Sequence, residues 1–195
     1  MNPDLDRKLR SLRLSGMVQA LPTRNQEAIH HNLAHVEFLE LLVEDELARR
    51  RDRLLARRLK AAGLTQVKML DTFDWSFNST IPKALVLDLA TVRFVGEHGG
   101  VLLLGPPGTG KTHIAQALTF AAIQAGYTAR YRSAFDLVQD LAEAHATGTR
   151  KQLVQQLTAV DLLVIEDLAC VAFPPQPLRT CWKSSPVATK PRPPS

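Results

Sequence analysis

Eight consecutive residues, from Gly105 to Thr112, have the types and the spacing that phosphate binding requires. They read Gly-Pro-Pro-Gly-Thr-Gly-Lys-Thr and match the pattern G-x-x-x-x-G-K-[ST] completely. Glycines allow backbone N–H groups to approach phosphate oxygens where a side chain would collide. The lysine adds a positive charge for the outer phosphates, and the final hydroxyl suits Mg²⁺. The predicted nucleotide contacts are Gly105, Pro106, Pro107, Gly108, Thr109, Gly110, Lys111, Thr112 and His113.

The residues on either side of this loop predict the elements that would position it. Residues 101–104 are Val-Leu-Leu-Leu, an apolar run that predicts a strand, and apolar spacing over 112–125 predicts a helix. A helix that begins near Thr112 directs its positive dipole end at a bound anion. Strand, loop and helix in this order favour a phosphate site over a purely structural glycine turn.

A second group of chemically useful residues follows another apolar run. Residues 161–165 predict a buried strand, which is followed by Glu166 and Asp167. We expect Glu166, together with the Thr112 hydroxyl, to hold Mg²⁺ partly through bound water, and Asp167 to polarise the attacking water. Two acids at a strand end also occur as a solubility device. Their position about fifty residues after a complete phosphate loop favours catalysis, with Lys111, Glu166 and Asp167 as the catalytic residues.

Helix and strand patterns alternate through the rest of the second half of the chain. A strand is predicted over 127–132, a helix over 134–146 and a further helical stretch over 151–157, which is the order of a parallel α/β sheet. The first part of the chain is helical instead. We expect a first helical segment that Pro22 interrupts, followed by a long helix over 35–62.

The outer side of the helix predicted over 35–62 is strongly basic. Arg49, Arg53, Arg57 and Lys60 fall at i, i+4, i+8 and i+11, so they form one ridge. The ridge is either a solvated face that complements the acidic start of the helix or a surface that follows the phosphates of duplex DNA. The DNA-binding interpretation assigns Arg49, Arg50, Arg53, Arg57, Arg58 and Lys60.

Three aromatic residues alternate in the segment before the loop. Phe73, Trp75 and Phe77 lie in a connector over residues 70–98, in which helical spacing resumes from Ile81 to Leu89. Their spacing is consistent with contact to a nucleotide base. It is also consistent with a packing clamp between two domains, which we favour.

Composition limits the class of protein. The chain has 195 residues, of which 45% are hydrophobic and 22% charged, as is ordinary for a globular protein. A net charge of +5 and a pI near 9.5 favour a polyanionic partner. Two cysteines exclude a disulfide framework, and no apolar run is long enough to span a membrane. We therefore expect a cytoplasmic protein that does not bind membranes.

Four segments of the chain resemble one known family, the IstB helper ATPases of IS21-type insertion sequences. This family belongs to the AAA+ class and is related to helicase loaders of the DnaC type. The segments, which lie within residues 5–169, are LDRKLRSLRLSGMVQAL, EFLELLVEDELARRRDRLLARRLKAAGL, GVLLLGPPGTGKTHIAQAL and DLLVIEDLA. The resemblance implies an α/β fold with a P-loop parallel sheet after a small all-α domain. In the family, Asp commonly stands where this sequence has Glu166.

The resemblance also implies a function and its partners. The family uses ATP and Mg²⁺ to assemble as a homo-oligomer on double-stranded DNA and to deliver a target to its transposase. Two alternatives remain open from the sequence. One is a loader of a replicative helicase, and the other is a remnant that binds DNA or nucleotide without turnover.

The end of the chain differs from the family in character. Seven of the 12 prolines lie in residues 170–195, and proline blocks helices and central strands. We expect a Pro-rich disordered tail here, an incomplete sheet and impaired hydrolysis, as in a truncated or frameshifted copy. A short form with a flexible basic tail is the alternative. The predicted division is a helical domain over 1–70, a connector over 71–98, a partial ATPase domain over 99–169 and this tail.

Overall fold

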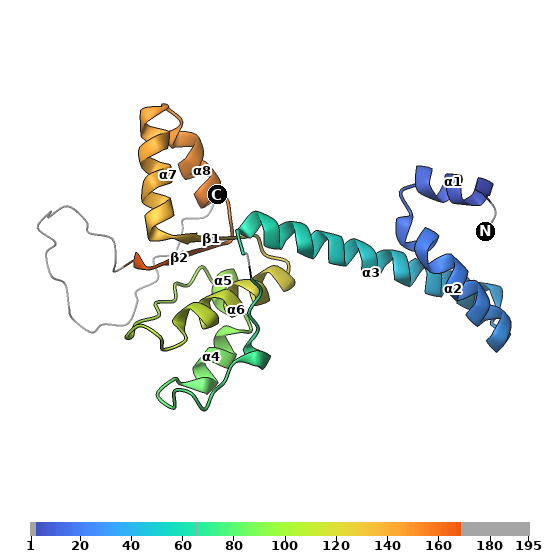
Figure 1. Cartoon of the computed structure of the whole chain (residues 1–195), viewed down its shortest axis with the longest axis horizontal. Helices are drawn as coiled ribbons and strands as arrows, with labels where there is room; N and C mark the ends of the chain where they lie inside the picture. Colours follow the sequence, from blue (N-terminus) through green and yellow to red (C-terminus); the bar gives the residue numbers. More distant parts are fainter. Residues whose placement is uncertain (1–2, 65, 169–195) are drawn as a thin grey trace, which may run out of the picture. The chain divides into compact units, whose positions relative to one another are not determined.

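The computed structural model describes residues 3–64 and 66–168, drawn as ribbon in Figure 1. The prediction of a Pro-rich disordered tail over 170–195 lies outside these residues. The chain forms two compact units, one ending at Arg58 and one beginning at Leu59. The predicted boundaries at residues 70, 98 and 169 remain a prediction.

The first unit is built from helices. They are α1 (Pro3–Ser11), α2 (Ser15–His31) and most of α3 (His35–Ala62), labelled in Figure 1. The bounds of α3 agree with the helix predicted over 35–62. Between α1 and α2, Arg13 has a positive φ of 59°, and this residue marks the break in the helical path.

The predicted interruption at Pro22 is wrong, because α2 continues through this residue. A proline inside a helix removes one backbone hydrogen bond and crowds the preceding turn. Tertiary contacts on both sides of Pro22 offset that cost. Arg24 binds the Asp45 carboxylate through two nitrogens, at 2.8 and 3.0 Å. The first turn of α2 is held by Glu46 of α3.

Glu46 caps the N-terminus of α2 from the neighbouring helix. Its Oε2 accepts the backbone N–H of Gly16 at 2.5 Å and of Met17 at 3.3 Å, while Oε1 accepts Arg50 Nε at 2.7 Å. No side chain of α2 itself caps this end. A Cβ at Gly16 would lie 2.7 Å from Glu46 Cα, so the close approach of the two helices requires glycine.

We expect Glu46→Gln to destabilise the first unit at neutral pH by about 1–3 kcal/mol, because charge-assisted bonds to buried groups are lost. Burial favours the protonated carboxyl, but Arg50 and the two amides outweigh it and hold the pKa of Glu46 below its ordinary value. The contribution of this carboxylate to stability is therefore complete above the unfolded pKa and is lost as pH falls through the lower, folded pKa.

Thermal unfolding of parent and variant measured from pH 7 to pH 3 tests this expectation. The difference between the two midpoints should be largest at pH 7 and should shrink below about pH 4.5. Glu40→Gln is the matched control, because Glu40 lies on the same helix and is exposed. A difference that stays constant down to pH 3 would show that Glu46 does not act through its charge.

The second unit contains all the strands that the structure describes. It begins with a short 3-10 helix, η1, which is followed by five α-helices and the two strands of a small sheet. They are η1 (Leu70–Thr72), α4 (Lys83–Leu89), α5 (Arg93–Gly96), α6 (Lys111–Gln124), β1 (Ala129–Ser133), α7 (Ala134–Ala146), α8 (Arg150–Thr158) and β2 (Leu162–Glu166).

The sheet consists of β1 and β2, which run parallel. Ala129 lies opposite Leu162, and Ser133 lies opposite Glu166. Helices α7 and α8 form the crossover between the strands, as parallel pairing requires. Helix α6 contacts both strands and lies beside them in Figure 1. The predicted α/β class is confirmed, with an incomplete sheet of two strands in the described residues.

The predicted strand over residues 101–104 is wrong. These residues form no strand in the structure, and Leu102 and Leu104 are each 72% exposed. A β-strand is stable only when a neighbouring strand pairs its N–H and C=O groups. Within residues 66–168 no strand pairs with this segment. Leu103 alone is turned inward and packs on the core.

One core cluster of the second unit is formed by residues of the segment before α4, of α4 and of α6. It consists of Phe73, Val86, Ile114 and Leu118. Trp75 packs against this core, with its ring centroid 4.9 Å from that of Phe73. The predicted clamp between two domains is therefore corrected, because Phe73 and Trp75 pack inside one unit.

Candidate nucleotide-binding site

The loop that the sequence predicted as a phosphate site leads directly into α6. Gly108 and Gly110 have φ values of +76° and +88°, a region that other residues rarely adopt. Among the described residues, no atom lies within 4 Å of the position that a Cβ of Gly108 would take. The backbone is therefore curled and open at this point, as a cradle for phosphate oxygens requires.

Lys111 is held across the loop by groups that can exchange for phosphate. Its Nζ donates to Pro106 O at 2.6 Å and to Thr109 Oγ1 at 3.4 Å. Thr109 Oγ1 also donates to Pro106 O, at 2.9 Å. The ammonium group thus lies over the loop, bonded to uncharged oxygen atoms that make weaker acceptors than a phosphate oxygen.

The start of α6 adds a second attraction for anions. The helix begins at Lys111 and runs for 14 residues. The N–H of Ile114 is the first to bond within the helix, to Gly110 O at 3.0 Å. The N–H groups before it have no helical acceptor, and they carry the positive end of the helix dipole.

A segment from far earlier in the sequence supports the junction between loop and helix. His113 Nε2 lies 2.9 Å from Met69 O, so this nitrogen carries the proton that it donates. The rings of Phe73 and His113 meet edge to face, with centroids 5.0 Å apart. A Cβ at Gly110 would lie 2.9 Å from two atoms of the Phe73 ring. Sequence reasoning named His113 and Gly110, gave Phe73 as one of three aromatic residues consistent with contact to a nucleotide base, and missed Met69.

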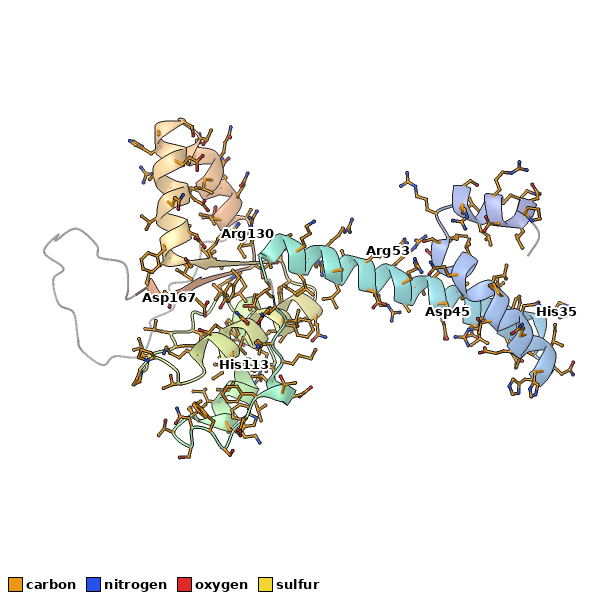
Figure 2. All side chains as sticks on the ribbon, viewed as in Figure 1. His35, Asp45, Arg53, His113, Arg130 and Asp167 are labelled. Carbon is orange, nitrogen blue, oxygen red and sulfur yellow. The ribbon has the colours of Figure 1, made fainter. Side chains whose placement is uncertain are left out.

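The two predicted acids lie at the carboxyl end of β2. Glu166 is its last residue, and Asp167 follows with a positive φ of 54°. Figure 2 shows Asp167 at the end of the strand and His113 on the first turn of α6. Glu166 is half-buried and Asp167 exposed. The backbone therefore leaves the extended conformation immediately after Glu166, at Asp167.

Two residues that the sequence did not single out belong to this part of the unit: Tyr131 lies next to Glu166, and Gln116 lies next to Tyr131. Burial, and then the Glu166 carboxylate, raise the pKa of Tyr131 above its ordinary value, whereas Gln116 acts in the opposite direction. Tyr131 Oη and Gln116 Oε1 are buried, and neither completes a hydrogen bond within the described part of the chain. The only available sequence signal was the alternation of β1, which places Tyr131 on the same face as Ser133.

Helix periodicity connects this cluster to the phosphate loop. Thr112 and Gln116 are four residues apart on α6 and share one face of the helix. Because Gln116 lies beside Tyr131 of β1, Thr112 lies one turn before it on the side of α6 that faces the sheet. The hydroxyl predicted for Mg²⁺ and the carboxylate predicted for Mg²⁺ therefore belong to the same side of the unit.

The donor set fits Mg²⁺ better than an ion that needs a protein cage. No group of three His, Cys, Asp or Glu side chains that could hold a metal occurs in residues 3–64 and 66–168. Mg²⁺ keeps several waters and uses one or two protein oxygens together with phosphates. The open glycine cradle and the unpaired Gln116 oxygen are consistent with such a hydrated ion.

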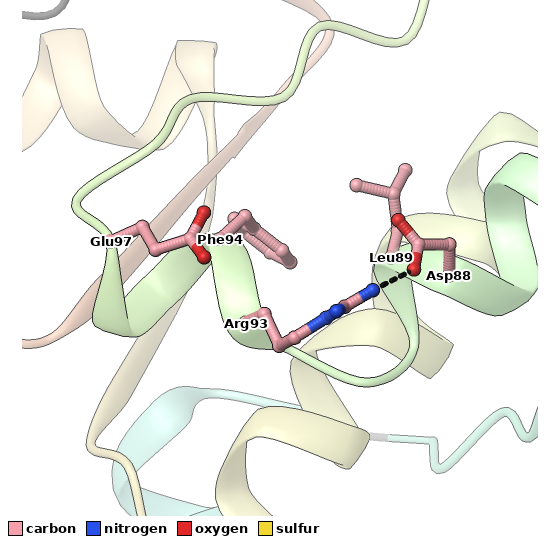
Figure 3. A pocket seen from close by; sticks show the side chains of 5 residues that line it. All are labelled: Asp88, Leu89, Arg93, Phe94 and Glu97. Carbon is pink, nitrogen blue, oxygen red and sulfur yellow. Dashed lines mark hydrogen bonds and ion pairs between the residues drawn. The ribbon is translucent and has the colours of Figure 1, made fainter.

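A surface hollow elsewhere in the unit does not contribute to this site. It is lined by Asp88, Leu89, Arg93, Phe94 and Glu97, as Figure 3 shows. Arg93 and Asp88 form an ion pair across it. None of the predicted nucleotide contacts lines the hollow.

The residues of α3 that are predicted to bind DNA are partly engaged within the protein. Arg50 binds Glu46, and Arg53 donates to Ser15 Oγ at 2.8 Å. Arg49 Nε is buried and has no partner among the described residues. Arg57 is exposed. The DNA-binding set remains a prediction.

No helix in the described residues combines the length and the apolar character that a membrane span needs.

Comparison with known proteins gives consistent matches. The sequence profile of a family described as IstB-like ATP binding protein matches residues 7–176. An insertion-sequence ATP-binding protein of Mycobacterium tuberculosis is 38% identical over 168 residues, which cover 86% of this chain and 67% of that protein. The IS1162 ATP-binding protein of Pseudomonas fluorescens is 36% identical, over 85% of this chain and 72% of its own length.

A third relative is the IS21 ATP-binding protein of Pseudomonas aeruginosa. It is 32% identical over 165 residues, which cover 85% of this chain and 62% of that protein. The chain spans about two thirds of the length of the curated relatives that it matches.

Proposed function

This chain belongs to the family of IstB-like ATP-binding proteins, and from that premise we propose that it binds ATP with Mg²⁺ at the loop formed by residues 105–112. The observation that carries this proposal is the open glycine cradle at the start of α6, with Lys111 held across it. A charged lysine, free N–H groups and a helix dipole all favour the same ligand, a chain of phosphates.

The side chains around the loop have distinct proposed roles. Lys111 neutralises charge on the outer phosphates. The Thr112 hydroxyl and Glu166 hold Mg²⁺, partly through water, and the metal supplies charge stabilisation when bound. Asp167 orients and polarises the water that attacks the γ-phosphate. The side of α6 shared by Thr112 and Gln116 supports this grouping.

The biological role that we propose is that of a helper in insertion-sequence transposition. The relatives are named as ATP-binding proteins of insertion sequences. We propose that ATP binding drives homo-oligomer assembly on double-stranded DNA and that the assembly presents target DNA to the cognate transposase. The net charge of +5 and the basic ridge of α3 support a DNA partner.

Replacing Arg49, Arg53, Arg57 and Lys60 by alanine tests the DNA proposal. We expect weaker binding to every duplex sequence, because phosphate contacts carry no sequence information. Each lost contact lowers the slope of log affinity against log salt by about 0.9, so four lost contacts lower it by about three to four. The measurement is fluorescence anisotropy of a labelled duplex over a series of salt concentrations, with Mg²⁺ and ATP present.

A variant with the same change in charge is the control. Arg7, Lys8, Arg10 and Arg93 all pair with carboxylates in the structure. Their replacement by alanine removes four positive charges outside the ridge, and we expect a slope close to that of the parent. Equal slopes for the ridge variant and the parent would contradict DNA binding by the ridge and would favour the other interpretation, a solvated helix face.

A further inference from the structure

Three polar side chains from three elements meet where α6 covers the strands. They are Gln116 of α6, Tyr131 of β1 and Glu166 of β2. Parallel pairing sets Tyr131 opposite Val164 and Ser133 opposite Glu166. Tyr131 and Glu166 therefore project from the same face of the sheet, offset diagonally by two residues. This is the face that α6 contacts.

Two atoms of this cluster are buried without a partner. Tyr131 Oη and Gln116 Oε1 lie out of contact with solvent, and neither completes a hydrogen bond within residues 3–64 and 66–168. Buried polar groups are almost always paired, because an unpaired group loses its bonds to water without replacement. Tyr131 Oη therefore has a hydrogen-bond donor that is not used, and the Glu166 carboxylate is an acceptor beside it.

We propose that Tyr131 is a positioning residue whose hydroxyl donates a hydrogen bond to the Glu166 carboxylate when a Mg²⁺-nucleotide is bound, while Gln116 Oε1 would accept a hydrogen bond from a water held by the metal. This inference rests on the proposed nucleotide function. Water bound to a cation acts as a donor, so its neighbours must be acceptors, and Gln116 Oε1 is the unpaired acceptor on the face shared with Thr112.

A phenol suits this role because it is an uncharged donor. A lysine or arginine at position 131 would also orient Glu166, but it would cancel the negative charge that attracts the metal. The tyrosine hydroxyl restricts the carboxylate to one rotamer and leaves its charge intact. Glu166 is longer by one methylene than aspartate, so it has one more rotatable bond to restrict.

The test compares Tyr131→Phe with Tyr127→Phe, the same change at the only other tyrosine of the chain. Affinity for a fluorescent ATP analogue is measured with Mg²⁺ and with EDTA, and thermal unfolding is measured without nucleotide. We expect Tyr131→Phe to reduce the gain in affinity from Mg²⁺ by about tenfold to a hundredfold, as is typical of residues that orient metal ligands. Affinity in EDTA should not change.

Thermal unfolding separates positioning from a merely structural role. Removing an unpaired buried hydroxyl should leave the midpoint of Tyr131→Phe unchanged or raise it. Tyr127→Phe should match the parent in its gain from Mg²⁺. Gln116→Met, which keeps the length of the side chain and removes the acceptor, should lower the same gain without affecting affinity in EDTA.

Each other outcome overturns the inference. If the parent binds nucleotide and Tyr131→Phe keeps the full gain in affinity from Mg²⁺, the positioning role is wrong. The proposed function is not affected by this outcome. Equal losses with Mg²⁺ and EDTA show a general distortion of the loop instead. A parent that binds no nucleotide under either condition overturns the proposed function and this inference together.

Discussion

Lys111→Ala is expected to abolish measurable ATP binding, with a loss in affinity of at least about a hundredfold. Lys111 is the only positively charged side chain of the loop, and its Nζ lies over the carbonyl of Pro106. Each charge-assisted hydrogen bond to a phosphate oxygen contributes about 1.5–3 kcal/mol, and the ammonium group can make more than one. Isothermal titration with ATP and Mg²⁺ measures the loss.

Lys151→Ala is the matched control for this result. Lys151 lies on α8, is exposed, and belongs to none of the predicted site residues. We expect its affinity for ATP to equal that of the parent. Equal affinities in parent and Lys111→Ala, with both proteins folded by thermal unfolding, would remove the assignment of the loop as the nucleotide site.

Gly110→Ala is expected to weaken ATP binding by at least about thirtyfold while leaving every charge in place. The left-handed backbone at Gly110 costs a residue with a Cβ about 1–2 kcal/mol. Overlap with the Phe73 ring adds about 1–3 kcal/mol. In the variant without nucleotide, we expect the loop to shift and so relieve both the backbone strain and the overlap. Binding requires the native loop geometry, so the cost is measured as lost affinity.

Two further variants identify the cause. Gly148→Ala changes another glycine of positive φ, where no atom lies within 4 Å of the added Cβ, and it should lower stability without affecting ATP affinity. Combining Phe73→Leu with Gly110→Ala should recover part of the affinity, because the smaller side chain reduces the overlap. A double-mutant cycle with no coupling between positions 73 and 110 would contradict the role of Phe73.

Local patterns were enough to determine several of the helices, among them two of the longest. The predicted helices over 35–62 and 134–146 agree with α3 and α7. Helical spacing and end signals act within a few residues, as at Ser133, whose hydroxyl accepts the N–H of Asp136 at the start of α7. The loop of residues 105–112 and the acids after β2 were also recognisable, because their chemistry depends on consecutive residues.

Pairing and packing decided what local patterns did not. The apolar run over 101–104 reads as a strand, but it forms none, since backbone pairing depends on a neighbour far away in the sequence. Pro22 reads as a helix break, but contacts of Arg24 with Asp45 and of Glu46 with Gly16 hold α2 together. At Pro22, long-range contacts stabilise a helix that the local sequence disfavours. Over residues 101–104, the local sequence favours a strand, but no strand in the described residues pairs with it.

The surroundings of the site depended on tertiary structure in the same way. Phe73 and Met69 reach the loop from about forty residues away, and Gln116, Tyr131 and Glu166 come from three elements. No spacing in the sequence connects them. Sequence by itself determined which residues could bind phosphate, because that chemistry is encoded in one loop. Only the register of β1 on β2 and the packing of α6 decided which other side chains stand beside them, because those contacts join residues distant along the chain.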